Sequence, residues 1–176
     1  DAALPFLTSV AASGKKVLYV GTKKQVKDIV KVSAEAAGQP YVTERWIGGM
    51  LTNVATITAQ LKKLHDLEKH MDSGDFEKRY NKLEVQRFQE EIDELNRKYS
   101  GIKNLSGKPG ALFVTDVIAD ANAIREAKTL GVPVVAIVDT NANPEDVDYV
   151  IPANDDAIKS VQILLDYVSA AIAEGT

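Results

Sequence analysis

The chain has 176 residues, of which 45% are hydrophobic, so it can bury one good core and needs no disulfide staples. It contains no cysteine, which excludes disulfides, thiolate metal sites and cysteine nucleophiles and fits a reducing compartment. The net charge of −4 argues weakly against a nucleic-acid partner.

The charge is distributed unevenly along the chain. Residues 1–110 carry 18 Lys and Arg against 14 Asp and Glu, whereas residues 111–176 carry 3 against 11. A polyanion would prefer the first part, and the acidic second part can suit a basic protein partner or simply serve solubility. The apolar runs are only strand-sized and the first residues lack signal-peptide features, which predicts a soluble cytoplasmic protein without a membrane partner.

The first elements follow the order strand, helix, strand. KKVLYVGTKK begins with an apolar run that ends in Gly21, which predicts a strand and a tight turn. Apolar residues then recur on one side of a helix that Gly38 and Pro40 end, and PYVT predicts a short second strand.

Two long helical segments without a strand between them follow, over residues 53–103. Apolar residues repeat at heptad spacing in both, as Val54, Ile57, Leu61, Leu64 and Met71 and then as Val85, Phe88, Ile92, Leu95 and Tyr99. MDSGDF lies between the segments and can turn the chain. The pattern predicts an antiparallel coiled-coil hairpin about 28 Å long, a length that suits reaching into a large partner.

The remaining elements alternate again. ALFVTD and VPVVAIVDTN predict strands around a helix over residues 119–130, and DYVIP predicts a last short strand. A final helix is expected over residues 155–173, capped by Asn154. Apolar strands that alternate with amphipathic helices indicate an α/β fold with a parallel sheet covered on both faces. The expected domains are an α/β domain, residues 1–52 and 104–176, and the inserted hairpin.

The turn after the first strand is where a doubly wound fold places a phosphate loop. VGTKK has one glycine, and neither G-x-G-x-x-G nor G-x-x-x-x-G-K-[ST] occurs in the chain, so a mononucleotide site has weak support. Thr22, Lys23 and Lys24 at a helix start can instead hold a backbone phosphate of a nucleic acid. The alternative is that Thr22 only caps the helix.

An enzyme is the second hypothesis, as an α/β nucleotide- or phosphate-binding protein. Asp116, Asp139, Asn141 and Asp155 follow the predicted strands, where open α/β sheets bind ligands, and carboxylates there can bind a divalent metal or act in acid–base chemistry. Asp and Asn are also the usual turn and cap residues at such junctions. The two histidines, five apart on a helix, lack a metal-site spacing, so we expect no cofactor, no metal and no catalytic residue.

RWIGGMLTN, residues 45–53, holds the only tryptophan of the chain. Gly48 and Gly49 allow the backbone to approach another molecule closely, and Arg45, Thr52 and Asn53 add phosphate-directed donors. Trp46 can stack on an unpaired base, which is worth about 1 to 3 kcal/mol, or pack inward and brace the hairpin. Its place between sheet and hairpin slightly favours packing inward.

Basic side chains also gather locally on the hairpin, although its 10 basic residues are balanced by 10 acidic ones. They either face RNA or form a solvated surface with ion pairs along the helices. The residues expected to contact RNA are Thr22, Lys23, Lys24, Arg45, Trp46, Gly48, Gly49, Thr52, Asn53, Lys62, Lys63, Lys78, Arg79 and Lys82.

Four stretches follow one another in the chain: VLYVGTKKQ, PYVTERWIGGMLTN, PGALFVTD and LGVPVVAIVDTNANPEDVDYVIPANDDAIKS. With these stretches in this order, the chain from about Gly14 to about Leu165 resembles the bacterial-type ribosomal protein S2 family. The resemblance implies a flavodoxin-like parallel sheet with an inserted helical hairpin. It also implies an N-terminal segment with an HFGH-like motif that this sequence lacks, so a shortened chain is expected.

The function implied by the resemblance is a non-enzymatic part of the small ribosomal subunit. Such a protein binds 16S-type rRNA at the head–body junction, contacts other small-subunit proteins and helps to recruit ribosomal protein S1 for translation. The ribosome expected is a cytoplasmic one, or that of an organelle.

Overall fold

The computed structural model describes residues 2–105, 107–139, 146–153 and 157–176. In chain order the elements are α1 (Ala3–Ala12), β1 (Val17–Val20), α2 (Lys27–Ala36), β2 (Tyr41–Val42), α3 (Val54–Asp72), α4 (Asp75–Arg79), α5 (Lys82–Tyr99), the 3-10 turn η1 (Ser100–Ile102), β3 (Ala111–Val114), α6 (Ala121–Leu130), β4 (Val134–Val138), β5 (Tyr149–Pro152) and α7 (Ile158–Gly175).

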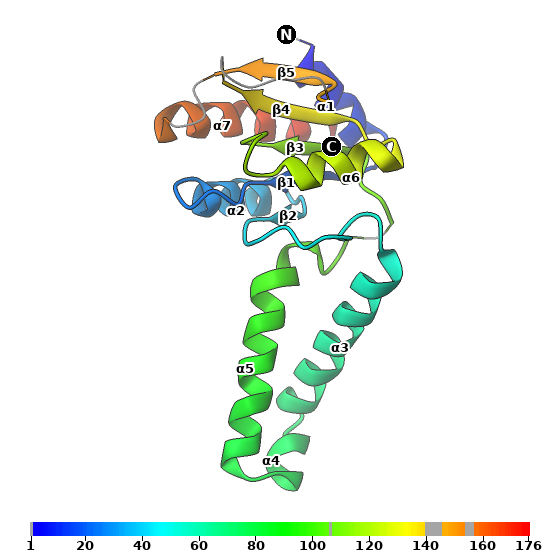
Figure 1. Cartoon of the computed structure of the whole chain (residues 1–176), viewed down its shortest axis with the longest axis vertical. Helices are drawn as coiled ribbons and strands as arrows, with labels where there is room; N and C mark the ends of the chain where they lie inside the picture. The colour runs from blue at the N-terminus through cyan, green and yellow to red at the C-terminus, as the bar shows by residue number, and fades with distance from the viewer. Residues whose placement is uncertain (1, 106, 140–145, 154–156) are drawn as a thin grey trace.

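The described strands form one parallel sheet in the order β2-β1-β3-β4-β5. The α/β architecture and the parallel sheet are as the sequence predicted, and this strand order is the flavodoxin-like one. All strands run in the same direction in Figure 1, so their amino-terminal ends share one edge and their carboxyl-terminal ends the other.

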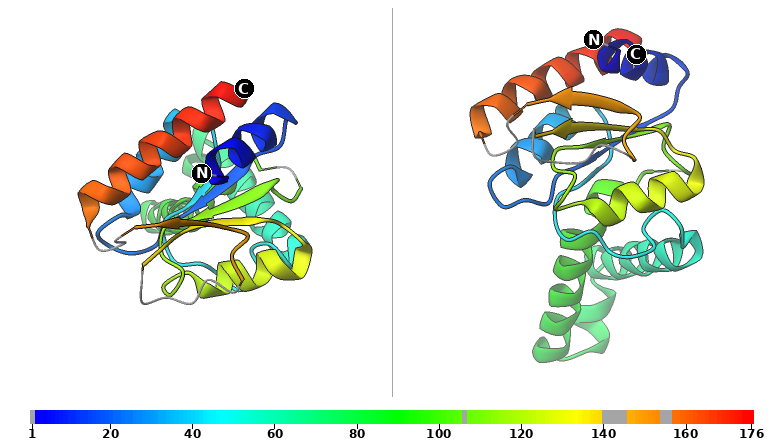
Figure 2. Two further views of the ribbon diagram at one scale, coloured as in Figure 1. Left: turned by 90° about the horizontal axis from the view of Figure 1, so that it is seen from above. Right: turned by 45° about the horizontal axis from the view of Figure 1, so that its top comes forward.

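Alternate residues of each central strand face opposite sides of the sheet, and each side has its own apolar core. Tyr19 and Phe113 point into the core under α1, α2 and α7. Leu18 and Val114 point into the core on the other side, where α6 is joined by the loop after β2 and the base of the hairpin. Figure 2 shows α1 and α7 on one side of the sheet and α6 on the other.

Glycines allow two close contacts around the sheet. A Cβ on Gly21, at the end of β1, would lie 2.6 Å from Cγ2 of Val30, so this glycine lets α2 pack against the strand. A Cβ on Gly101 would lie 2.0 Å from the carbonyl oxygen of Tyr41, so η1 can approach β2 only because residue 101 has no side chain.

The hairpin projects from the α/β part, with α3 and α5 side by side and converging toward the tip in Figure 1. Ile57, Leu64, Ile92 and Leu95 are buried along the seam, as the heptad spacing predicted. Val54 is 62% exposed, so its predicted place in the seam is wrong. The helices stand apart at the base, and the seam therefore begins one turn later. The coiled-coil geometry stays a prediction.

The segment MDSGDF, expected only to turn the chain, also begins the short helix α4. Phe76 of α4 is 8% exposed and stacks on Phe88 with ring centroids 4.1 Å apart, while the ring of Tyr80 meets both edge-on. An aromatic cluster thus closes the tip of the hairpin.

Helix α7 begins at Ile158, later than the expected start at residue 155, and Asn154, the predicted cap, lies outside the described residues. None of the helices in the described ranges has the length and apolar character needed to cross a membrane.

Candidate nucleic-acid interface

The loop after β2, residues 43–53, carries the chain from the sheet to the hairpin. Gly49 has φ +92°, a conformation that favours glycine, and the N–H of Asn53 donates to its carbonyl oxygen over 2.7 Å. The side-chain oxygen of Asn53 accepts from the N–H of Thr56 and so caps α3. The loop therefore fixes the first turn of α3, and Asn53 contributes to this by capping the helix.

One carboxylate from α6, that of Glu126, binds this loop. It accepts five hydrogen bonds: from Trp46 Nε1 at 2.8 Å, from the N–H groups of Gly49 and Leu51 at 3.0 and 3.1 Å, and from both the N–H and the hydroxyl of Thr52 at 3.2 and 3.1 Å. The donors that sequence analysis assigned to RNA phosphates at Thr52 are thus engaged by a side chain of the protein.

These bonds set the pKa of Glu126. Partial burial raises it, but the hydrogen bonds from the Trp46 indole and from the backbone of Gly49, Leu51 and Thr52 together outweigh burial. The pKa lies below its ordinary value, so the carboxylate stays charged at neutral pH and holds the loop as an anion.

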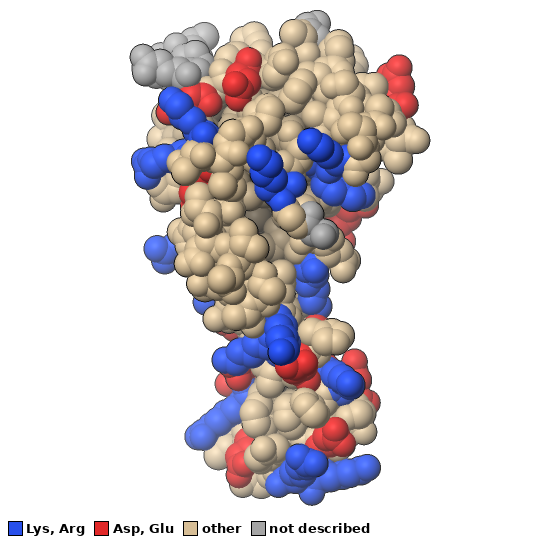
Figure 3. All heavy atoms as spheres, turned by 90° about the vertical axis from the view of Figure 1, so that its right-hand side faces the viewer, with Lys and Arg blue, Asp and Glu red and all other residues tan. Residues whose placement is uncertain are grey.

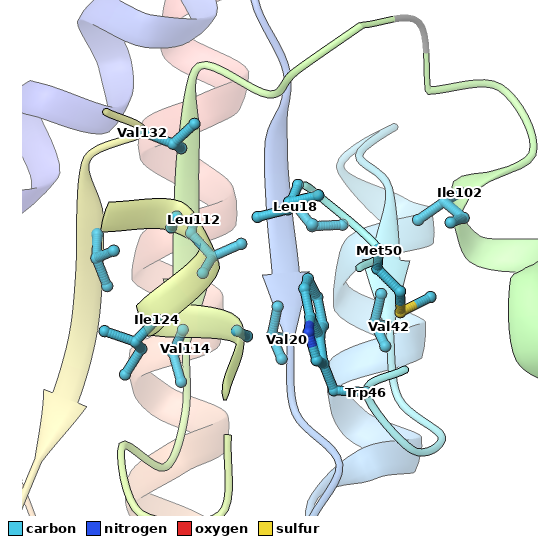
Figure 4. Close-up of a cluster of buried hydrophobic side chains, with 14 of the residues drawn as sticks. Leu18, Val20, Val42, Trp46, Met50, Ile102, Leu112, Val114, Ile124 and Val132 are labelled. Carbon is cyan, nitrogen blue, oxygen red and sulfur yellow. The ribbon is translucent and has the colours of Figure 1, made fainter. Parts of the chain in front are cut away.

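Trp46 packs inward. It is 8% exposed, and Figure 4 shows its ring between Val20 of β1 and Val42 of β2, close to Met50. Of the two roles weighed for this residue, bracing the junction is the one that its burial supports. The indole shields the sheet and orients the loop through Glu126.

Arg45 and Gly48 are exposed residues of the same loop. They line an open groove of about 560 Å³ together with Arg97 and Lys98 of α5. Arg97 and Lys98 bind Glu94 over 2.6 and 3.3 Å, whereas Arg45 has no hydrogen bond or ion pair within the described part of the chain. Arg97 also binds Glu44, which does not line the groove, over 3.5 Å. The three cations thus exceed the two carboxylates, and the groove keeps a small positive charge.

Thr22, Lys23 and Lys24 lie at the carboxyl edge of the sheet, away from this groove. The hydroxyl of Thr22 donates to Asp120 Oδ1 over 2.5 Å, and Lys23 Nζ lies 3.3 Å from Asp116 Oδ2. Helix α2 begins only at Lys27, so the alternative that Thr22 caps it is wrong. Lys24 is exposed and has no partner among the described residues.

Asp120 fills the position where a phosphate would meet the turn after β1. Burial raises the pKa of its carboxyl, hydrogen bonds from the side chain and backbone of Thr22 lower it, and the charge of Asp116 raises it again, with a net rise. A second anion is disfavoured beside these carboxylates. The weak support for a mononucleotide site in the sequence agrees with this arrangement.

The hairpin cations do not join the loop in one site. Lys63 binds Glu91 of the opposite helix over 2.5 Å, and Lys62 is exposed beside it on α3. Lys78, Arg79 and Lys82 are exposed at the tip. The expected contacts therefore fall into three places: the carboxyl edge, the base of the hairpin and the hairpin itself.

Among the carboxylates after the predicted strands, Asp116 has a local role besides its ion pair with Lys23. Asp116 Oδ1 accepts from the N–H groups of Ile118 and Ala119 over 2.9 and 3.0 Å, which is a turn role. Asn141 and Asp155 lie outside the described residues. His70 binds Asp75 over 3.1 Å, and the described residues contain no group of three metal-ligating side chains.

Sequence analysis missed Glu126. It lies 80 residues from Trp46 in the chain, within a helix whose other charged residues face solvent. The local sequence gives one indication of its role, which is its spacing from two buried residues of α6. Glu126 follows Ala123 by three residues and Ile124 by two, so it lies at the border of the apolar face of the helix.

Comparison with known protein families gives one match that covers nearly the whole chain. The model of the family described as ribosomal protein S2 matches residues 1–175.

Similar proteins carry the same kind of name. Small ribosomal subunit protein uS2 of Chloroflexus aggregans is 47% identical over 173 residues, which are 98% of this chain and 72% of that protein. The uS2 protein of Pseudoalteromonas translucida is 49% identical over 175 residues, 99% of this chain and 72% of the relative.

Proposed function

Because the chain belongs to the ribosomal protein S2 family, whose members are structural, non-enzymatic components of the small ribosomal subunit, we propose that it binds 16S-type rRNA through cations at the base of its hairpin. The proposal places the protein on the ribosome, cytoplasmic or organellar, with no cofactor.

The observation that carries the proposal is the groove between the loop after β2 and α5. Arg45 projects there without a partner in the described part of the chain, beside Arg97 and Lys98. Glu126 and Trp46 hold the loop rigid, so Arg45 and the exposed backbone at Gly48 are presented with little loss of entropy on binding. Lys24 and the exposed hairpin cations supply further phosphate contacts.

Replacing Arg45 and Lys24 together by Ala tests the proposal. A plot of log affinity against log salt has a negative slope for RNA binding. Each phosphate contact that is lost should make this slope shallower by about 1 and weaken binding to transcribed small-subunit rRNA. Lys31→Ala with Lys159→Ala removes the same charge from exposed positions on α2 and α7 and serves as the control. An unchanged affinity and slope in the Arg45 and Lys24 variant would show that the site assignment is wrong.

Docking of ribosomal protein S1 is the second part of the proposal. It is supported by the family resemblance and by the acidic residues 111–176, whose surface suits a protein partner better than RNA. Capture of purified S1 by this chain should persist after nuclease treatment. Loss of capture with nuclease would mean that RNA, and not protein contact, carries the association.

A further inference from the structure

Lysines that no part of the sequence analysis singled out gather at the amino edge of the sheet. Lys15 and Lys16 directly precede β1, and Lys108 precedes β3, its neighbour in the sheet. Since parallel strands begin at the same edge, these lysines meet there, on the side opposite the carboxyl edge that holds Asp116 and Asp120. Figure 3 looks onto this edge and shows Lys and Arg side chains across it.

Lys15 and Lys108 line the same open hollow of about 380 Å³. Its floor contains Gly110, where an added Cβ would lie 2.7 Å from Cβ of Lys15, so the lysine stem lies across a bare backbone. Lys108 Nζ donates to the carbonyl oxygen of Leu130 over 3.1 Å, and Lys16 Nζ to that of Gly38 over 3.3 Å. These carbonyl groups orient the lysines without neutralising their charge.

The segments that carry these lysines contain no acidic side chain. Residues 2–16 and 107–110 contain neither Asp nor Glu. Asp146 and Asp148 precede β5, farther along the same edge, and both are engaged: Asp146 binds Lys128 over 2.5 Å, and Asp148 Oδ2 accepts from the N–H of Val134 over 2.8 Å. The side chain of Lys15 has no hydrogen bond or ion pair among the described residues.

We propose that Lys15, Lys16 and Lys108 form a second RNA-binding surface that takes the phosphate backbone, a proposal that rests on the proposed function. Lysine acts as a point charge and suits phosphates that are read without base contacts. Figure 3 shows further basic side chains on the hairpin on the same face, beyond uncharged surface and mixed with acidic side chains, a distribution that suits a long polyanion better than a short acidic peptide. The protein would then contact RNA along this edge as well as at the Arg45 groove.

The test replaces Lys15 and Lys108 by Ala in the full chain and measures binding to transcribed small-subunit rRNA between 50 and 200 mM salt. We expect the negative slope of log affinity against log salt to become shallower by about 1 for each lysine removed. Binding should weaken to a similar extent for RNAs of any sequence. The control is again Lys31→Ala with Lys159→Ala, for which slope and affinity should stay within error of the wild type. Thermal unfolding of both variants verifies that the fold is intact.

The outcomes separate the two proposals. Salt-dependent binding by the wild type together with an unchanged slope in the Lys15 and Lys108 variant would overturn the second surface alone. A wild-type chain that binds no rRNA would overturn the proposed function and this surface with it. Binding of a polyglutamate peptide that the variant loses, with RNA binding unchanged, would assign the surface to an acidic protein partner instead.

Discussion

Glu126 is the residue on which the junction between sheet and hairpin depends most. Its carboxylate accepts hydrogen bonds from the Trp46 indole and from three backbone N–H groups, which without it would point into a partly buried space. Removing a partner from such groups costs more than the bond itself contributes, because each donor loses both its protein partner and its water. The position of Arg45 beside its groove therefore depends on Glu126, a side chain that does not line that groove.

We expect Glu126→Ala to lower the free energy of unfolding by about 2 to 4 kcal/mol, since several donors are left unpaired at once. Urea denaturation at neutral pH measures this change. Glu35→Ala removes an exposed carboxylate from α2 and should change the free energy of unfolding by less than about 0.5 kcal/mol. Equal effects of both substitutions would contradict the role given to Glu126.

The pH dependence of stability gives an independent test of the same residue. The pKa of Glu126 is lower in the folded chain than its ordinary value of 4.5, so its charge contributes stability that is present above that pH and lost as pH falls through the lowered pKa. The stability difference between wild type and Glu126→Gln should be full at pH 7 and shrink below pH 4.5. A difference that stays constant down to pH 3 would rule this account out.

At the scale of elements, the hairpin is fixed at its two ends by different means. Its base is bound by the loop after β2 and by η1, which reaches β2 because Gly101 lacks a side chain. Its tip is closed by the rings of Phe76, Tyr80 and Phe88. The tip is therefore a small apolar cluster remote from the two cores of the sheet, and it can open without unfolding them.

Phe76→Ala should open the tip selectively. Loss of a buried aromatic ring costs about 3 kcal/mol, which corresponds to roughly a 100-fold loss of hydrogen-exchange protection for amides of α4 and the adjoining ends of α3 and α5. Amides of β1 and β3 should keep their protection. Leu83→Ala, at a neighbouring residue that is 57% exposed, is the matched control, and comparable loss in both variants would refute the tip cluster.

At the scale of the whole molecule, segregation of charge matters more than its sum. The net charge is −4, yet cations gather at the amino edge of the sheet and at the Arg45 groove, while residues 111–176 carry 11 acidic residues against 3 basic ones. Figure 3 shows basic side chains from the α/β part to the tip of the hairpin, mixed with acidic ones on the hairpin. A uniformly negative protein would repel RNA, and salt would weaken that repulsion.

The sign of the salt effect separates these two cases. If the segregated cations meet the RNA, raising salt from 50 to 200 mM should weaken binding of the wild-type chain, because each counterion released from the RNA gains less entropy in a more concentrated salt solution. Filter binding or fluorescence anisotropy with transcribed small-subunit rRNA measures it. Binding that strengthens with salt would mean that net charge dominates over the local cations.

Local pattern was enough to predict much of this protein. The alternation of apolar strands with amphipathic helices predicted the parallel sheet, and the 3,4 spacing of apolar residues predicted the seam from Ile57 to Leu95, because period and burial are properties of neighbouring residues. Val54 was placed wrongly, since spacing does not reveal where two helices diverge.

Only the tertiary structure decided what the polar residues of RWIGGMLTN do. Glu126 reaches Trp46 across 80 positions of sequence, and Asp120 reaches Thr22 across 98. Lys15 and Lys108 likewise become neighbours because β1 and β3 are adjacent in the sheet. Periodicity fixes which face of an element is buried, but hydrogen bonds and charge clusters form between elements, so their partners follow from the order in which the strands pair.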